Sequence, residues 1–307
     1  MSFCKSYYNS PTTHLIMAKK THKKTTTRKK KNTTSWKSLV AFLIVMLIVG
    51  FVKTFADENS APAPQPQVEG LEKVIIPEGT SNEIVNYEGF TVYFNRDTHI
   101  PNCTVYELTI GEAQATGKRI DNFQQDTSVE GCPTLDDYKY SGYDRGHLVP
   151  AGDMKWSTQA MNDCFYLTNM LPQKQALNSG AWNQLEQKVR NWVIRDSALI
   201  IVTGPILSKY DWNTTIGDTR VVVPSSMFKA ILAPHTTPMR AIAFVYSNKK
   251  AEGSLADHAV SIDHIENITG LDLFSSLPDD IEPQIESTCD FKQWNASRPK
   301  NKKKSNK

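Results

Sequence analysis

The stretch Tyr143–Pro150 reads YDRGHLVP and gives the strongest indication of fold and chemistry in this chain. Its histidine, His147, lies among apolar residues, and a histidine in that setting is more often structural than catalytic. Two later segments change this interpretation. Phe165–Leu171 (FYLTNML) is a second strand-like run, and a helix predicted over Ser179–Arg195 carries polar side chains. Two strands, one ending in histidine, and such a helix form a compact unit that can hold one divalent ion.

The predicted helix brings two charged residues together. Glu186 and Arg190 are four residues apart, so their side chains are neighbours on one flank of a helix. Asn178 stands at the helix start, two turns before Glu186, and can offer its amide oxygen on the same side. Without the histidine, two other interpretations are equally good: Asn178 as an N-terminal cap, and a surface ion pair between Glu186 and Arg190.

The region from about Val68 predicts a mixed α and β domain. Short β-rich runs bounded by turn residues are expected to be strands: Phe90–Asn95, Val105–Ile110, Ala198–Thr203, Arg220–Val223 and Ala241–Tyr246. A second helix is predicted over Leu255–Ile268.

The ordered set of residues from Tyr143 to Trp192 resembles the DNA/RNA non-specific endonuclease family, the endonuclease G-like part of the ββα-metal superfamily. The Asp-Arg-Gly-His motif of that family stands here at residues 144–147. The asparagine metal ligand of the family matches Asn178, with Glu186 eight residues later and Arg190 four beyond. The resemblance implies an α+β fold of the ββα-metal nuclease type, with a central, mostly antiparallel sheet flanked by helices.

The similarity covers roughly residues 75–280 and implies a mechanism that meets the needs of phosphodiester hydrolysis, namely a base, charge neutralisation and help for the leaving group. His147 would be the general base, since imidazole titrates near ~6.5. Asn178 would bind Mg²⁺ directly, with Mn²⁺ as a substitute, because a hard ion accepts an amide oxygen and keeps several waters. Glu186 would hold metal-bound water. The products would carry 5′-phosphates.

Arginine and asparagine side chains complete the implied site. Arg190 would contact the scissile or an adjacent phosphate, and Arg119 matches a phosphate-binding arginine of the family. Asn169 matches a family asparagine, for which a structural role is as good as a catalytic one. Arg145 is interpreted mainly as a buried ion-pair partner of Asp144. Because arginines and Mg²⁺ contact groups that every nucleotide shares, the expected activity is a sugar-non-specific, sequence-non-specific cleavage of DNA and RNA.

Charge is distributed unevenly along the chain. Residues 1–53 carry eleven Lys and Arg without Asp or Glu, and Arg298–Lys307 carry six more. All 32 Asp and Glu lie between Asp57 and Asp290, which leaves the middle of the chain near −14. A local cluster or a metal must therefore hold a polyanion there, since the overall field opposes it.

An apolar run near the N-terminus, Leu39–Val52, predicts export. The basic block before it keeps the N-terminus in the cytoplasm, which leaves the catalytic domain outside, either anchored in the membrane or secreted or periplasmic after cleavage behind Ala56. The predicted segments are a basic cytoplasmic segment at 1–37, a transmembrane signal anchor or signal peptide at 38–56, a Pro-rich linker at 57–69, the endonuclease domain at 70–296 and a basic disordered tail at 297–307.

Cysteines follow the apolar run in an even number: Cys103, Cys132, Cys164 and Cys289. No CxxC pair occurs, which argues against a structural zinc site. In an exported domain, two disulfides are expected, and of the three pairings we choose Cys103 with Cys132 and Cys164 with Cys289.

Two other function classes compete with a nuclease. A membrane-tethered nucleic-acid-binding module for DNA uptake, without catalysis, would be expected to lack one of His147, Asn178 or Glu186, and all three are present. An exported metallopeptidase would need an HExxH pair, which the sequence lacks. The expected partners are DNA and RNA, the membrane through residues 38–56 if they stay uncleaved, and a second copy in a homodimer.

Overall fold

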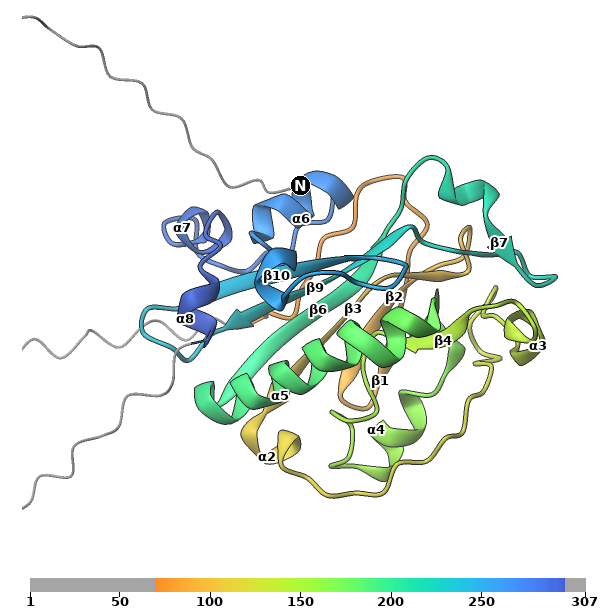
Figure 1. Cartoon of the computed structure of the whole chain (residues 1–307), viewed down its shortest axis with the longest axis horizontal. Helices are drawn as coiled ribbons and strands as arrows, with labels where there is room; N and C mark the ends of the chain where they lie inside the picture. The colour runs from red at the N-terminus through yellow and green to blue at the C-terminus, as the bar shows by residue number, and fades with distance from the viewer. Residues whose placement is uncertain (1–69, 296–307) are drawn as a thin grey trace, which may run out of the picture. The chain divides into compact units, whose positions relative to one another are not determined.

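A seven-stranded sheet forms the centre of this computed structural model, which describes residues 70–295 (Figure 1). Every pair of neighbouring strands is antiparallel. The strand order is β1 (Glu83–Tyr87), β2 (Phe90–Asn95), β3 (Ile100–Thr109), β6 (Ala198–Ile206), β9 (Ser226–Ala233), β10 (Arg240–Ser247) and β11 (Ala259–Val260). The prediction of an α+β fold with a central antiparallel sheet is thereby confirmed.

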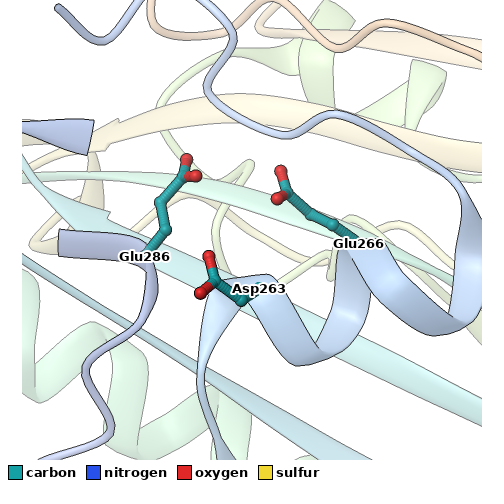
Figure 2. Close-up of side chains that lie close together, drawn as sticks. All are labelled: Asp263, Glu266 and Glu286. Atoms are coloured by element: carbon teal, nitrogen blue, oxygen red, sulfur yellow. The ribbon is translucent and has the colours of Figure 1, made fainter. Parts of the chain in front are cut away.

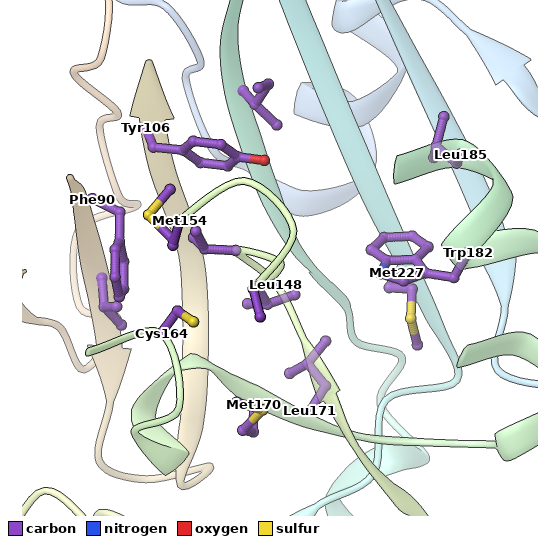
Figure 3. Packing of buried hydrophobic residues seen from close by; sticks show 14 of the residues in the cluster. Phe90, Tyr106, Leu148, Met154, Cys164, Met170, Leu171, Trp182, Leu185 and Met227 are labelled. Atoms are coloured by element: carbon purple, nitrogen blue, oxygen red, sulfur yellow. The ribbon is translucent and has the colours of Figure 1, made fainter. Parts of the chain in front are cut away.

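Two hydrophobic cores lie on the two faces of the sheet. Along β6, Leu199 and Ile201 belong to one core, whereas Ile200 and Val202 belong to the other. Successive strand residues point to opposite faces, so a strand buried on both sides is apolar throughout. Helix α5 (Asn183–Asp196) covers the first core, part of which Figure 3 shows around Leu148, Met154, Trp182 and Leu185. Helices α6 (Ile262–Thr269) and α7 (Glu282–Glu286) cover the second.

The predicted two strands and helix form one unit on the α5 face (Figure 1). Strand β4 (Asp144–His147) pairs antiparallel with β5 (Met170–Gln173), which places His147 opposite Met170. Gly146 is required by close packing, because a Cβ there would lie 2.6 Å from the Cβ of Gln173. The predicted strand over 165–171 begins instead with a 3₁₀ turn, Leu167–Asn169, that follows helix α4 (Thr158–Asp163).

The helix predicted over 179–195 begins differently from the expectation. A π-helical turn, Leu177–Trp182, precedes α5, and Gly180 leaves the helical region at φ −98° and ψ −113°. Glycine tolerates this backbone because it lacks a Cβ. Asn178 therefore lies in a wide turn and is no N-terminal cap of α5. From Asn183 the helix is regular and buries the apolar stripe of Leu185, Val189, Trp192 and Val193.

The helix predicted over 255–268 is divided in two. Residues 255–258 form a 3₁₀ turn, β11 pairs with β10, and α6 starts after Ser261, whose hydroxyl accepts a hydrogen bond from the His264 N–H. Of the strand predicted over 220–223, only β8 (Val221–Val222) forms. The remaining elements are α2 (Ile110–Ala113), α3 (Leu135–Tyr138), a 3₁₀ turn at Asp211–Asn213, β7 (Thr215–Ile216) and α8 (Phe291–Asn295).

The disulfide prediction is wrong. Cys103, Cys132 and Cys164 are free thiols, and all three are buried. Cys103 packs into the core under α6 and α7, whereas Cys132 and Cys164 belong to the core on the α5 face, so the sheet separates Cys103 from Cys132. The Cys164 thiol donates to the Met161 carbonyl at 3.1 Å, which excludes its predicted pairing with Cys289. Burial raises the pKa of Cys132 and of Cys164 to about 12, which keeps both thiols protonated.

Several sequence predictions fall outside the described residues. These are the basic N-terminal segment, the membrane or signal segment, the linker and the basic tail. Between residues 70 and 295, no helix has the length and apolar character that crossing a membrane requires. The segment boundaries therefore stay predictions.

Candidate active site

A cavity of about 290 Å³ opens between the end of β4, the loop that follows it and the start of α5. Six predicted site residues, up to 71 positions apart, line it: Arg119, Arg145, His147, Asn178, Glu186 and Arg190. Asp144 and Asn169, also predicted, do not line the cavity. Asp144 contacts Asn178, which does, and Asn169 binds the main chain of Val149, next to Pro150 in the cavity wall. The fold thus brings the predicted set together at one place.

His147 ends β4 and packs between two aromatic rings. Its imidazole lies 5.4 Å from the Phe123 ring and 4.9 Å, edge to face, from the Phe165 ring, measured between centroids. Burial, together with the guanidinium groups of Arg119 and Arg145, lowers the pKa of His147 to about 3. Within residues 70–295, the buried Nε2 atom has no hydrogen-bond partner. A neutral imidazole with an unused ring nitrogen can take a proton from water.

Asn169 fixes the backbone just beyond His147. Its side-chain oxygen accepts from the Val149 N–H at 3.0 Å, and its Nδ2 donates to the Val149 carbonyl at 3.0 Å and to the Cys164 carbonyl at 2.8 Å. The side chain is fully buried and all its hydrogen-bonding groups bind main chain. These contacts favour the structural interpretation of Asn169.

Lys229 is a functional candidate that the sequence reasoning missed. It lies on β9 with 1% of its surface exposed, and its ammonium donates to the Thr203 hydroxyl at 2.7 Å and to the Leu148 carbonyl at 3.2 Å. It therefore holds the residue that follows His147 in place. The signal in the sequence is a single lysine inside the apolar run VVVPSSMFKAILA at 221–233.

Asp144 orients Asn178. The Asn178 Nδ2 donates to the Asp144 Oδ2 at 3.0 Å, which leaves the amide oxygen of Asn178 without a hydrogen bond from any residue in 70–295. The predicted ion pair between Asp144 and Arg145 is wrong, because neighbouring residues of β4 point to opposite sides. The Arg145 guanidinium instead lies 4.0 Å from the centroid of the Phe123 ring.

Arg190 is held by a buried carboxylate that the sequence reasoning also missed. The Arg190 Nη1 lies 2.6 Å from the Asp153 Oδ1, and Asp153 is 1% exposed. Asp153 also accepts a hydrogen bond from the Tyr106 hydroxyl at 2.7 Å. A Cβ on Gly152 would lie 2.7 Å from the Arg190 Nη1, so glycine is needed where the guanidinium crosses the chain. The alternative pairing of Arg190 with Glu186 does not form, because Asp153 occupies the guanidinium.

Glu186 faces the cavity with its carboxylate unused. No residue in the described range donates a hydrogen bond to it or forms an ion pair with it. Burial raises the pKa of Glu186 to about 7, opposed by the positive charge of Lys229. This carboxylate and the amide oxygen of Asn178 are oxygen groups of the cavity that could hold a hard cation.

The remaining arginine is more exposed. The Arg119 Nε lies 2.7 Å from the Asp121 Oδ1 in a pair whose side chains are 50% and 66% exposed, and its guanidinium lies 5.2 Å from the Phe165 ring. With Arg145 and Arg190, it gives the cavity three guanidinium groups. The acidic domain therefore has a local positive cluster where an anion could bind.

The lowered pKa of His147 predicts a measurable loss of stability in acid. Between about pH 6.5 and pH 3 the unfolded chain binds a proton on this histidine and the folded chain does not, so the free energy of unfolding falls as the pH falls through this window. We expect the urea midpoint of the wild type to drop more between pH 7 and pH 5 than that of His147→Gln. Equal drops would contradict the burial argument.

Comparisons with known proteins agree with this site. Residues 67–280 match the family described as DNA/RNA non-specific endonuclease. Nuclease EXOG, mitochondrial, from Mus musculus is 31% identical over 255 residues, which cover 76% of this chain and 68% of that protein. The protein named Nuclease from Serratia marcescens is 30% identical over 224 residues, covering 68% of this chain and 81% of that protein.

A solved structure of a related protein is also similar to this chain. The crystal structure of the EndoG/EndoGI complex matches with a TM-score of 0.59 and 27% identity, over 64% of this chain and 87% of that chain. The family match extends over more than half of the sequence and includes the residues that line the cavity. The resemblance read from the sequence is confirmed, and the chain belongs to the DNA/RNA non-specific endonuclease family.

Proposed function

We propose that this protein is an endonuclease that hydrolyses DNA and RNA without sequence or sugar specificity, with His147 as general base and one Mg²⁺ ion. The observation that carries the proposal is the meeting of His147, Asn178 and Glu186 in one cavity beside three arginines. Membership of a nuclease family supports it. A binding module without catalysis would have no need for this combination of base and metal ligands.

The oxygen atoms of the cavity suit Mg²⁺. Asn178 has an oriented amide oxygen, since its Nδ2 is bound to Asp144, and Glu186 has an unused carboxylate. Mg²⁺ prefers such oxygen ligands, keeps several waters and needs few protein groups. Asn178 would bind the ion directly and Glu186 through a water, with Mn²⁺ as the expected substitute. When bound, the ion supplies positive charge to a phosphate oxygen and to the leaving 3′-oxygen.

The side chains of the protein would supply the general base and bind the phosphates. His147 takes the proton of the water that attacks phosphorus, and its low pKa keeps it neutral at physiological pH. Arg119, Arg145 and Arg190 bind phosphate oxygens around the scissile bond. Because these contacts involve the backbone of the nucleic acid, they carry no sequence information. The bond to the 3′-oxygen breaks, which leaves a 5′-phosphate on the product.

The substrate range gives the first test. Duplex DNA, single-stranded DNA and RNA of unrelated sequences are incubated with the protein in Mg²⁺ or in EDTA. We expect all three to be degraded in Mg²⁺ and none in EDTA. A gel shift without cleavage would favour the binding module, cutting at a single sequence would contradict non-specificity, and cutting in EDTA would contradict the metal.

Residues 38–56 support a further proposal, that the catalytic domain is exported and stays anchored or is released by cleavage. The similar protein from Mus musculus is named mitochondrial, so the compartment has to be measured. Cell fractionation with sequencing of the mature N-terminus checks this. An intact chain in the membrane fraction indicates an anchor, a chain that starts after Ala56 indicates a cleaved signal, and recovery in mitochondria or the cytoplasm would contradict export.

Loss of the Asp144 carboxylate should weaken metal binding. In Asp144→Ala the carboxamide of Asn178 loses its acceptor and can rotate, and groups that orient a metal ligand are commonly worth about 10–100-fold in affinity. We expect the Mg²⁺ concentration for half-maximal cleavage to rise by about that factor. Asp136→Ala, an exposed aspartate on the nearby α3, is the matched control and should leave it unchanged. An unchanged Mg²⁺ requirement in Asp144→Ala would show that this contact does not orient Asn178.

A further inference from the structure

A second group of carboxylates lies on the face of the sheet opposite the cavity. Asp263 and Glu266 belong to α6, and Glu286 is the last residue of α7. One carboxylate oxygen from each lies within 4.8 Å of the others. Figure 2 shows the three side chains directed toward a common space between the two helices. The proposed nuclease mechanism uses none of them.

Glu286 is the residue that points to a ligand. It is 4% exposed, yet it has no hydrogen bond and no ion pair with any residue in 70–295. Its carboxylate is aimed at Asp263 and Glu266 (Figure 2). Three carboxylates so close together repel one another when ionised, so a bound cation or a proton would stabilise the cluster.

The surroundings make the ionised cluster costly without a counter-charge. Burial, together with the neighbouring carboxylates of Glu266, Glu282, Asp263 and Asp272, raises the pKa of Glu286 to about 8. Burial likewise raises the pKa of Glu266. Burial also raises the pKa of the neighbouring Asp272, opposed by the ammonium of Lys73.

The ligand set favours Ca²⁺. Ca²⁺ is commonly bound by several carboxylates, whereas Mg²⁺ is usually bound by one or two and keeps several waters. Three carboxylates, each with an oxygen within 4.8 Å of the others, meet the first requirement. One oxygen of Glu266 accepts from the Leu273 N–H at 2.7 Å, which orients that carboxylate and leaves its second oxygen for the ion.

We propose that Asp263, Glu266 and Glu286 form a Ca²⁺ site that joins α6 to α7. The site holds α7 against α6 on this face of the sheet, where Ile285 of α7 and Ile265 of α6 are buried in the same core. Its role is to stabilise this end of the domain. It is separate from the catalytic cavity and does not depend on the proposed nuclease activity.

The test uses calorimetry with CaCl₂ and thermal unfolding, on metal-free full-length protein at pH 8. All samples carry Asn178→Ala, so that the catalytic cavity lacks its direct metal ligand. We expect one Ca²⁺ to bind per chain and the Tm to rise by about 5–10 °C when calcium reaches 100 times its Kd. MgCl₂ at the same concentration should give a smaller rise.

Two further variants separate loss of the site from loss of the fold. Glu286→Gln should abolish calcium binding and the Tm rise, while its calcium-free Tm equals or exceeds that of the parent, because a buried charge is gone. Asp263→Asn should weaken calcium binding. Glu252→Gln, at an exposed glutamate outside the cluster, is the matched control and should bind as the parent does. Absence of calcium binding in the parent, or an unchanged response in Glu286→Gln, would overturn the proposal. So would a Tm that rises from pH 8 to pH 6 without responding to calcium, since protons would then hold the cluster.

Discussion

Replacing His147 with alanine is expected to lower kcat for both DNA and RNA by about 10²–10⁴-fold, because general base catalysis contributes about that much. The Nε2 atom of His147 has no hydrogen-bond partner in the described range, so the change removes a reactive group without breaking a hydrogen bond of that atom. The variant should therefore keep its fold. Initial rates on plasmid DNA and on RNA, with circular dichroism of the same samples, measure both expectations.

A control and a rescue sharpen this prediction. His235→Ala, at an exposed position on the loop after β9, should cleave as the wild type does. Added imidazole should restore part of the activity of His147→Ala, since the base can be supplied from solution to an open cavity. Undiminished cleavage by His147→Ala would contradict the assignment, and a loss that imidazole and higher pH both leave unchanged would favour a structural role for the ring.

The second large effect is expected from Asp153→Ala. This carboxylate is 1% exposed and binds both the Arg190 guanidinium and the Tyr106 hydroxyl. Removing one partner of a buried ion pair leaves the other charge uncompensated, which typically costs about 3–5 kcal/mol in the free energy of unfolding. Arg190 also loses the contact that holds it against Gly152, so KM for nucleic acid should rise. Urea unfolding and steady-state kinetics measure the two effects.

Asp121→Ala is the matched control for this variant. Asp121 also pairs with an arginine, Arg119, at 2.7 Å, but its side chain is 66% exposed. Exposed ion pairs contribute little, so its unfolding free energy should change by less than about 1 kcal/mol. Equal losses in the two aspartate variants would show that Asp153 has no special structural role.

Local sequence pattern was enough to predict much of the fold. The run at 90–95 forms β2 with the predicted bounds, and the apolar stripe of α5 is buried as its helical spacing indicates. Strand β9 was missed, because it is apolar on both faces and has Lys229 in its middle, so it shows no period-two alternation. The division of 255–268 was missed because the pairing of β11 with β10 depends on residues distant in the sequence.

The candidate site, too, was predicted only where the local sequence pattern carries the information. Sequence reasoning predicted six of the residues that line the cavity, and five of them belong to the ordered motif, whose residue types and spacing are set by the chemistry. Lys229 and Asp153 were not predicted, because their roles rest on contacts with Leu148 and Arg190, 81 and 37 positions away. The disulfide prediction failed for a related reason: the sequence does not tell on which face of the sheet a cysteine lies.

We expect the cavity of His147 and Asn178 to direct water onto phosphorus with loss of the 3′-oxygen. Cleavage of a short DNA and of the corresponding RNA in water enriched in ¹⁸O, with Mg²⁺, tests it by mass spectrometry. We predict that both substrates give 5′-phosphate ends that carry one ¹⁸O, and that the 3′-hydroxyl ends carry none. Unlabelled phosphate, 3′-phosphate ends, or RNA products with a 2′,3′-cyclic phosphate would contradict the account.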